Sequence, residues 1–260
     1  MNTSAPGRGR LCVVGLGPGD DALLTEQVRA SIASATDAFG YFPYVARLGG
    51  MEHLQLHASD NREELERARQ ALDLAAQGRQ VLMLSSGDPG VFAMASAVFE
   101  VLESAASEDK ARWAAVDIEV QPGITAMLAA AARLGAPLGH DFCTINLSDN
   151  LKPAAVIARR IRLAAQADFA MAFYNPCSTS RPEGFVRALT VLREECEPER
   201  LICFARNVSR PGETLKVLPL HAVTADMADM RTVVIVGNSL TRQVGKHVYT
   251  PRSYGLPAHE

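Results

Sequence analysis

The sequence predicts an α/β fold built as two domains, and three observations support this prediction. Short apolar runs typical of β-strands alternate with segments of helical periodicity along the first half of the chain. Turns rich in glycine and proline follow several of these runs directly. The chain has 260 residues, 48% of them hydrophobic, which suffices for one large domain or two smaller ones. We therefore expect a sheet with helices on its faces.

The first half contains three predicted strands, at 11–14, 80–84 and 117–120, and four predicted helices, at 22–35, 61–77, 92–104 and 125–133. The helix at 61–77 has the strongest signals. Asn61 is its expected cap, Glu64 follows three places on, and Gly78 supplies a left-handed end. One face of this helix is expected to be apolar and carries Leu65, Ala68, Leu72 and Ala76.

The segment 134–142 carries two glycines and a proline and interrupts the periodicity, so we expect domains at 1–138 and 139–260. The second half contains five predicted strands, at 143–147, 169–174, 201–205, 213–219 and 232–237, and two predicted helices, at 153–165 and 182–195. Long helices are missing between some of the last strands, which favours antiparallel pairing there.

Composition excludes several classes of protein. The formal net charge of −3 disfavours a nucleic-acid partner, because proteins that grip a phosphate backbone are usually basic. The sequence contains no run of eighteen apolar residues, so no membrane span is predicted, and residues 1–10 lack the apolar run of a secretory signal. The five cysteines form no Cys-x-x-Cys pair, so we expect neither a disulfide framework nor a metal site. These features predict a cytoplasmic protein.

The first chemical motif is GLGPGD at 15–20, directly after the first predicted strand. It resembles a dinucleotide fingerprint but has Asp20 in place of the last glycine, and Pro18 removes an N–H that a pyrophosphate would use. The loop therefore suits the close approach of a ligand without phosphates. The alternative is a tight turn that binds nothing.

Two more motifs also follow predicted strands. SSGDPGVF at 85–92 places a carboxylate, Asp88, where ligands of open α/β sheets bind, although Asp88 could instead cap the next helix. PGITA at 122–126 begins a helix, whose free N–H groups and the Thr125 hydroxyl suit a ligand carboxylate. Here the alternative is an ordinary helix start. Together the three loops fit an amino-acid zwitterion joined to a nucleoside.

In order and spacing, GLGPGD, SSGDPGVF and PGITA resemble the S-adenosylmethionine-binding loops of the tetrapyrrole (corrin/porphyrin) methyltransferases. FYNP at 173–176 and ARNVSRPGE at 205–213 resemble later loops of that family, and the resemblance extends over residues 10–255. The segments 40–48, 145–153 and 236–241 resemble one branch, which methylates a corrin precursor in cobalamin synthesis and contracts its ring.

The resemblance implies two α/β domains of the tetrapyrrole methylase type with the cofactor cleft between them, a homodimer, S-adenosylmethionine as cofactor and a tetrapyrrole as substrate. It also implies a set of cofactor contacts, carried over by position: Pro18, Ser86, Gly87, Asp88, Val91, Thr125, Ala126, Asn175 and Val208.

The implied reaction needs an aligned methyl donor and, for ring contraction, a general base. His140, Asp88 and Asp149 are the candidates, with His140 and Asp88 preferred; a linker histidine bonded to backbone is the alternative for His140. The substrate carboxylates suit arginine, and Arg206 and Arg210 lie in a motif loop. Further arginines are Arg47, Arg159, Arg160 and Arg181, and Tyr44 with Tyr41 could cover the macrocycle or simply pack together.

Four other functions compete with this interpretation. They are methylation of a different corrinoid carbon, methylation of RNA or a translation factor, nicotinamide-dependent oxidoreduction, and corrinoid carriage without catalysis. The acidic balance disfavours RNA, and the broken fingerprint disfavours a nicotinamide cofactor.

Overall fold

The computed structural model describes residues 9–60, 62–178 and 182–254. The chain divides into two compact units, Met1–Thr125 and Ala126–Glu260. The division falls thirteen residues before the expected boundary between 138 and 139. The reason is that helix α6 (Ala126–Leu134) packs on strands β11 (Thr232–Val236) and β13 (His247–Tyr249) of the second unit.

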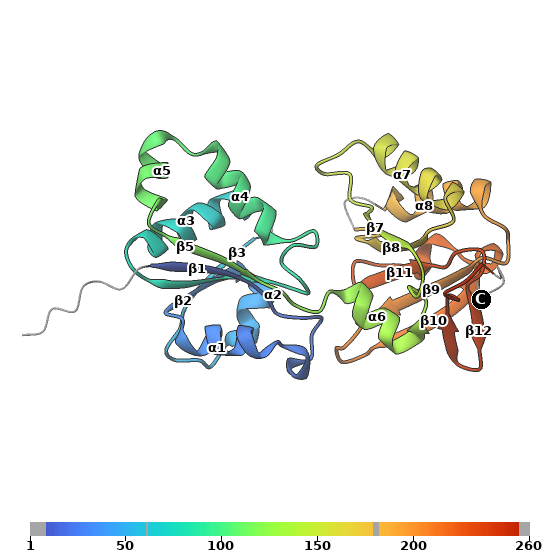
Figure 1. The fold of residues 1–260 in the computed structure, drawn as a ribbon, viewed down its shortest axis with the longest axis horizontal. Helices are drawn as coiled ribbons and strands as arrows, with labels where there is room; N and C mark the ends of the chain where they lie inside the picture. Colours follow the sequence, from blue (N-terminus) through green and yellow to red (C-terminus); the bar gives the residue numbers. More distant parts are fainter. Residues whose placement is uncertain (1–8, 61, 179–181, 255–260) are drawn as a thin grey trace, which may run out of the picture. The chain divides into compact units, whose positions relative to one another are not determined.

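The first unit is built on a five-stranded sheet in the order β3-β2-β4-β1-β5, and every pairing in it is parallel (Figure 1). Its strands are β1 (Arg10–Gly15), β2 (Asp37–Tyr41), β3 (Gln55–Ser59), β4 (Gln80–Ser85) and β5 (Asp117–Gln121). The predictions of β1, β4 and β5 are confirmed, whereas β2 and β3 were not predicted.

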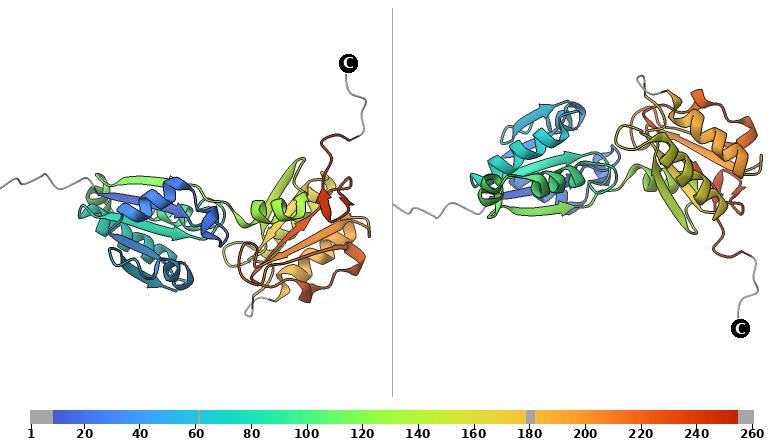
Figure 2. Two further views of the ribbon diagram at one scale, coloured as in Figure 1. Left: turned by 90° about the horizontal axis from the view of Figure 1, so that it is seen from below. Right: turned by 90° about the horizontal axis from the view of Figure 1, so that it is seen from above.

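Helices cover both faces of this sheet, as a parallel sheet requires (Figure 2). One face carries η1 (Asp21–Leu23), α1 (Glu26–Ser34), α2 (Phe42–Val45) and η2 (Ala46–Leu48); the other carries α3 (Glu64–Ala76), α4 (Met94–Ser104) and α5 (Ser107–Trp113). Alternation along β1 feeds both cores, with Leu11 and Val13 packed toward α3 and α4, and Cys12 and Val14 toward α1.

Helix α3 differs from its prediction at the start. It begins at Glu64 with Glu63 as its cap, so the cap predicted at Asn61, which lies outside the described residues, is wrong. Leu65 is exposed rather than buried, because the buried face of α3 is centred on Ala68, Ala71 and Ala75 and Leu65 lies at its margin. Arg67, on the other side of that face, is buried instead and donates to Ser59 Oγ at 2.8 Å and to the Asp60 carbonyl at 2.5 Å. The left-handed Gly78 at the other end is confirmed, with φ of 88°.

The second unit holds a mixed sheet in the order β10-β9-β11-β8-β7. Its further strands are β7 (Phe142–Asn146), β8 (Ala170–Tyr174), β9 (Leu201–Arg206) and β10 (Thr214–Pro219). Only β7 and β8 pair in parallel, so the predicted antiparallel pairing is confirmed. Helices α7 (Ala154–Gln166) and α8 (Glu183–Glu195) pack on one face of this sheet and α6 lies on the other.

Shorter elements complete the second unit. Strands β12 (Arg242–Val244), β13 and β6 (Gly135–Ala136) form a small sheet, and η3 (Leu220–Ala222) and η4 (Ala225–Met227) precede β11. Within the described ranges, no helix combines the length and the apolar character needed to cross a bilayer.

A buried carboxylate fastens the edge of the first sheet. Asp37 at the start of β2 is fully buried, and it accepts hydrogen bonds from Arg79 Nε at 2.7 Å, His57 Nε2 at 2.9 Å and Thr36 Oγ1 at 2.7 Å. Burial by itself raises the pKa of Asp37, but these hydrogen bonds outweigh it and hold the pKa below its usual value. The charged form is therefore the one that stabilises β2 and β3.

We expect Asp37→Asn to lower the free energy of unfolding by about 2 kcal/mol at pH 7, because the hydrogen bonds to a charged acceptor are lost. Since the folded pKa is depressed, the wild type keeps this contribution above the unfolded pKa of about 3.9 and loses it as pH falls below that value. Urea unfolding between pH 7 and pH 3 measures both effects. The control is Asp109→Asn on α5, whose exposed pair with Arg112 contributes about 0.5 kcal/mol or less. Equal losses in the two variants would contradict the prediction.

Candidate functional site

Three loops leave the first sheet side by side at its carboxyl edge. Strand β1 lies between β4 and β5 and runs parallel to both, so residues 16–20, 86–91 and 122–125 emerge together. This is the edge at which open α/β sheets bind ligands. It carries five of the predicted cofactor contacts, Pro18, Ser86, Gly87, Asp88 and Val91, and Thr125 ends the third loop.

The loops touch through their backbones. Gly17 and Gly87 exchange two hydrogen bonds, of 3.1 and 2.8 Å, and Leu16 N–H donates to the Ser85 carbonyl at 2.8 Å. A Cβ on Gly15 would lie 2.5 Å from the Gly87 oxygen, and one on Gly123 would lie 2.2 Å from the same atom. Only glycine therefore permits this approach at positions 15 and 123.

Asp88 joins the second loop to the third. Its Oδ1 accepts from Gly90 N–H at 2.8 Å, and its Oδ2 accepts from Gly123 N–H at 3.1 Å. The alternative that Asp88 caps the following helix is wrong, because α4 begins at Met94 with Ala93 as its cap. The carboxylate fixes the loops and places a negative charge beside them.

A second carboxylate, that of Asp20, disfavours phosphate binding at the first loop. Asp20 caps η1, and its Oδ1 accepts from Ala22 N–H at 2.9 Å. The predicted helix at 22–35 is divided here, since α1 starts only at Glu26 with Thr25 as its cap. An anion would meet Asp20 instead of free N–H groups, so this edge favours a cationic or zwitterionic ligand over a pyrophosphate.

The carboxyl edge of the second sheet carries the later motifs. Strands β8 and β9 both run antiparallel to β11, which lies between them, so their carboxyl ends share one edge with that of β7. Asn175, with φ of 51°, follows β8 and donates from Nδ2 to Asn146 Oδ1 at 3.1 Å. Asn175 and Asp149 line one small hollow, and Asp149 accepts from Arg187 at 2.8 Å.

The start of α6 is less open than predicted. Met127 N–H donates to the Tyr174 hydroxyl at 2.9 Å, so this N–H is not free for a ligand. The tyrosine of the FYNP motif therefore fastens α6, beside Ala126, to the end of β8. The motif indicated a loop contact, but nothing in the sequence spacing indicated this hydrogen bond.

The candidate substrate arginines behave differently from one another. Arg206 Nε donates to Asp229 Oδ2 at 2.8 Å on a half-exposed surface. Burial by itself raises the pKa of Asp229, but hydrogen bonds from Thr232 and Arg206 outweigh it and hold the pKa below its usual value, so the carboxylate is ionised. Such pairs contribute little, so Arg206 remains able to turn to a substrate carboxylate. Arg210 is exposed and Val208 buried in the same loop.

Two further candidate arginines lie on a helix and not in the motif loops. Arg159 and Arg160 lie exposed on α7, and Arg181 falls outside the described residues. Tyr44 packs edge to face on Tyr41, with ring centres 5.5 Å apart, as in the aromatic-pair alternative. Tyr41 ends β2 and Tyr44 lies in α2, so both tyrosines are at the carboxyl edge of the first sheet.

His140 lies at the other edge of the second sheet. It precedes β7, and the neighbouring Asp141 carbonyl accepts from Ala170 N–H at the start of β8. Its Nδ1 accepts from Asp141 N–H at 2.8 Å, and its ring packs on Tyr254. The five residues of β8 separate this edge from Asn175 by roughly 16 Å. Within the second unit, the structure brings Asp149 to the motif loops and not His140.

Comparison with known proteins identifies the class. Residues 10–224 match the family model of the Tetrapyrrole (Corrin/Porphyrin) Methylases. The chain belongs to this family, and it is a methyltransferase.

Individual members of the family are similar to the chain over nearly its whole length. The chain is 49% identical over 251 residues to a precorrin-3B C(17)-methyltransferase of Sinorhizobium sp., a match that covers 95% of this chain and 97% of the relative. It is 36% identical to a probable cobalt-factor III C(17)-methyltransferase of Salmonella typhimurium, with 95% of this chain and 100% of the relative covered. The crystal structure of the methyltransferase CobJ superposes with a TM-score of 0.89 at 60% identity, over 94% of this chain and 100% of that one.

We expect Gly123→Ala to lower the free energy of unfolding by about 1–3 kcal/mol, because the new methyl group would overlap the Gly87 carbonyl and separate the loops. Chemical denaturation measures the loss. Gly49→Ala is the matched control, since a Cβ there meets only the Ala46 oxygen, at 3.1 Å. If the two variants are equally stable, the packing of the three loops does not constrain this position.

Proposed function

We propose that this chain transfers a methyl group from S-adenosylmethionine to carbon 17 of precorrin-3B, with ring contraction to precorrin-4, in cobalamin biosynthesis. The observation that best supports this reaction is the 49% identity, over nearly the full length of both chains, to a relative named precorrin-3B C(17)-methyltransferase. Methylation of the cobalt-containing intermediate is the second candidate, favoured by the relative of 36% identity. The higher identity favours the metal-free substrate.

The residues of the first unit suit this cofactor. The glycine edge admits a ligand against bare backbone, and Asp88 and Asp20 place negative charge beside it. S-adenosylmethionine supplies a methyl group on a positively charged sulfur and carries an ammonium group, both of which these carboxylates favour. In our proposal Pro18, Ser86, Gly87, Asp88, Val91 and Thr125 contact the cofactor from the first unit, and Ala126, Asn175 and Val208 from the second.

The methyl transfer mainly requires that the methyl donor and the accepting tetrapyrrole carbon be aligned. The reduced tetrapyrrole carbon is electron-rich, so no covalent protein nucleophile is needed, and positioning accounts for much of the rate. Arg206 and Arg210 would hold substrate carboxylates, and Tyr44 would cover the macrocycle. Ring contraction requires a proton to leave a hydroxyl as a carbon–carbon bond migrates, which a carboxylate or imidazole base assists.

The proposal also includes a homodimer, as the family resemblance implies, and a cytoplasmic location, as the composition predicts. Light scattering separates the 27.9 kDa protomer from a dimer of twice that mass.

A turnover assay tests the reaction. We expect precorrin-3B mixed with methyl-labelled S-adenosylmethionine and the purified protein to give a product heavier by one labelled methyl group, with the absorption spectrum of a contracted ring. Mass spectrometry and absorption spectroscopy provide the readout. Cofactor binding, measured separately by calorimetry, serves as the control. Binding without turnover on precorrin-3B, but with turnover on its cobalt counterpart, would establish the second candidate instead.

Two variants test the general base. We expect Asp149→Asn to lower kcat by about a hundredfold, within the usual range for loss of a general base, and His140→Ala to leave kcat within about threefold. Asp149 lies at the motif edge of the second sheet, whereas His140 lies at the opposite edge. Single-turnover kinetics at saturating cofactor measures the chemical step. The reverse ranking would restore His140 as the base.

A further inference from the structure

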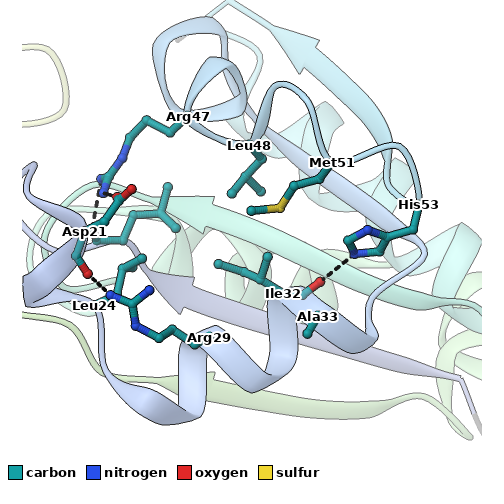
Figure 3. A pocket seen from close by; sticks show the side chains of 10 residues that line it. Asp21, Leu24, Arg29, Ile32, Ala33, Arg47, Leu48, Met51 and His53 are labelled. Atoms are coloured by element: carbon teal, nitrogen blue, oxygen red, sulfur yellow. Dashed lines mark hydrogen bonds and ion pairs between the residues drawn. The ribbon is translucent and has the colours of Figure 1, made fainter.

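A pocket beside the first glycine loop lies in the first unit, between α1 and the segment that follows α2 (Figure 3). Its cavity volume is about 290 Å³. The wall is mainly apolar and is formed by Leu24, Ile32, Leu48 and Met51. His53 closes one end, where its Nε2 bonds the Ile32 carbonyl at 3.1 Å. This interior suits a flat apolar group.

The other end of the pocket is charged. Arg47 donates to Asp21 Oδ1 at 2.9 Å, and Arg29 donates to the main-chain oxygen of Asp21. Figure 3 shows both arginines reaching this end from different elements. Two guanidiniums face one carboxylate here, which leaves a net positive charge, and each guanidinium carries five N–H donors, more than these contacts use. The rim therefore favours an anionic group with several acceptors.

Arg47 also links the pocket to the first glycine loop. Its Nη1 donates to the Leu16 carbonyl at 2.8 Å, and Leu16 lines the pocket as well as the loop. A ligand held on this rim is thereby anchored to the backbone that carries Pro18. The charged end of the pocket thus lies beside the loop proposed to hold the methyl donor.

We propose that this pocket binds one carboxylate-bearing pyrrole edge of the tetrapyrrole substrate, with the ring against Ile32 and Met51 and its carboxylate on Arg29 and Arg47. The proposal rests on the function proposed above and names a specificity site for it. The cavity, of about 290 Å³, lies just below the usual range for small-molecule sites, about 300–1,000 Å³, so it accommodates one substituted ring and not the whole macrocycle.

The test uses porphobilinogen, a single pyrrole with acetate and propionate arms, as the probe of the cofactor-free protein. Ala33→Phe fills the pocket from the exposed side of α1, and Ala30→Phe is the matched control, since Ala30 is exposed on the same helix outside the lining. We expect porphobilinogen binding, followed by calorimetry, to weaken at least about tenfold in Ala33→Phe and to stay within about twofold in Ala30→Phe. Arg29→Gln is expected to weaken it by about tenfold, as loss of one charge-assisted contact does.

Kinetics then decides whether the bound ring is the substrate's own edge. Ala33→Phe should raise KM for the tetrapyrrole by about tenfold and leave cofactor binding unchanged. Equal porphobilinogen binding in the two phenylalanine variants, or no binding to the wild type, would overturn the pocket. Loss of porphobilinogen binding with an unchanged KM would overturn its assignment to the substrate. Failure of methyl transfer alone would count against the proposed function and leave the porphobilinogen result to judge the pocket.

Discussion

The close approach of three backbones at one edge of the first sheet is the constraint on which the rest of the site depends. Neighbouring strands lie only about 4.8 Å apart, so loops leaving β4, β1 and β5 can meet only where no side chain intervenes. Gly15 and Gly123 satisfy this condition, and a Cβ on Gly123 would come within 2.2 Å of the Gly87 oxygen. With the gap closed, the Asp88 carboxylate reaches Gly123 N–H. The position of the third loop therefore depends on the absence of a side chain at Gly15 and Gly123 and on the carboxylate of Asp88.

Charge then distinguishes this edge from a nucleotide site with similar glycines. In phosphate-binding loops, backbone N–H groups and a helix N-terminus face the ligand. Here Asp20 caps the N-terminus of η1, and the Asp88 carboxylate accepts hydrogen bonds from the N–H groups of Gly90 and Gly123. A phosphate would be repelled, whereas a sulfonium or an ammonium group would be attracted. The glycine pattern sets how closely a ligand approaches, and the two carboxylates set which ligand that is.

The loops were predictable from sequence because their signals are local, whereas their surroundings depend on contacts between distant residues. Glycine runs after apolar strands identified all three loops. Strands β2 and β3 contain Asp37 and His57 and show little apolar periodicity. They are held by hydrogen bonds to Asp37 from residues 20 and 42 positions away. The edge on which His140 lies depends on the direction of β7, which spacing does not reveal. Leu65 was misplaced because the packing of α3 on the sheet buries a face centred on Ala68, Ala71 and Ala75, with Leu65 at its margin, and the helix sequence alone does not fix that rotation.

In the proposed reaction, Arg47 would fix the position of the two reactants relative to each other. An in-line displacement is sensitive to small errors of alignment, so donor and acceptor are best held by the same rigid backbone. Arg47 bonds the Leu16 carbonyl of the first glycine loop and faces the pocket proposed for the substrate edge. A pyrrole edge anchored there would keep a fixed relation to the loop proposed to hold the methyl donor. The carbon that is methylated would then be selected by which edge of the macrocycle enters the pocket, and not by a reactive side chain.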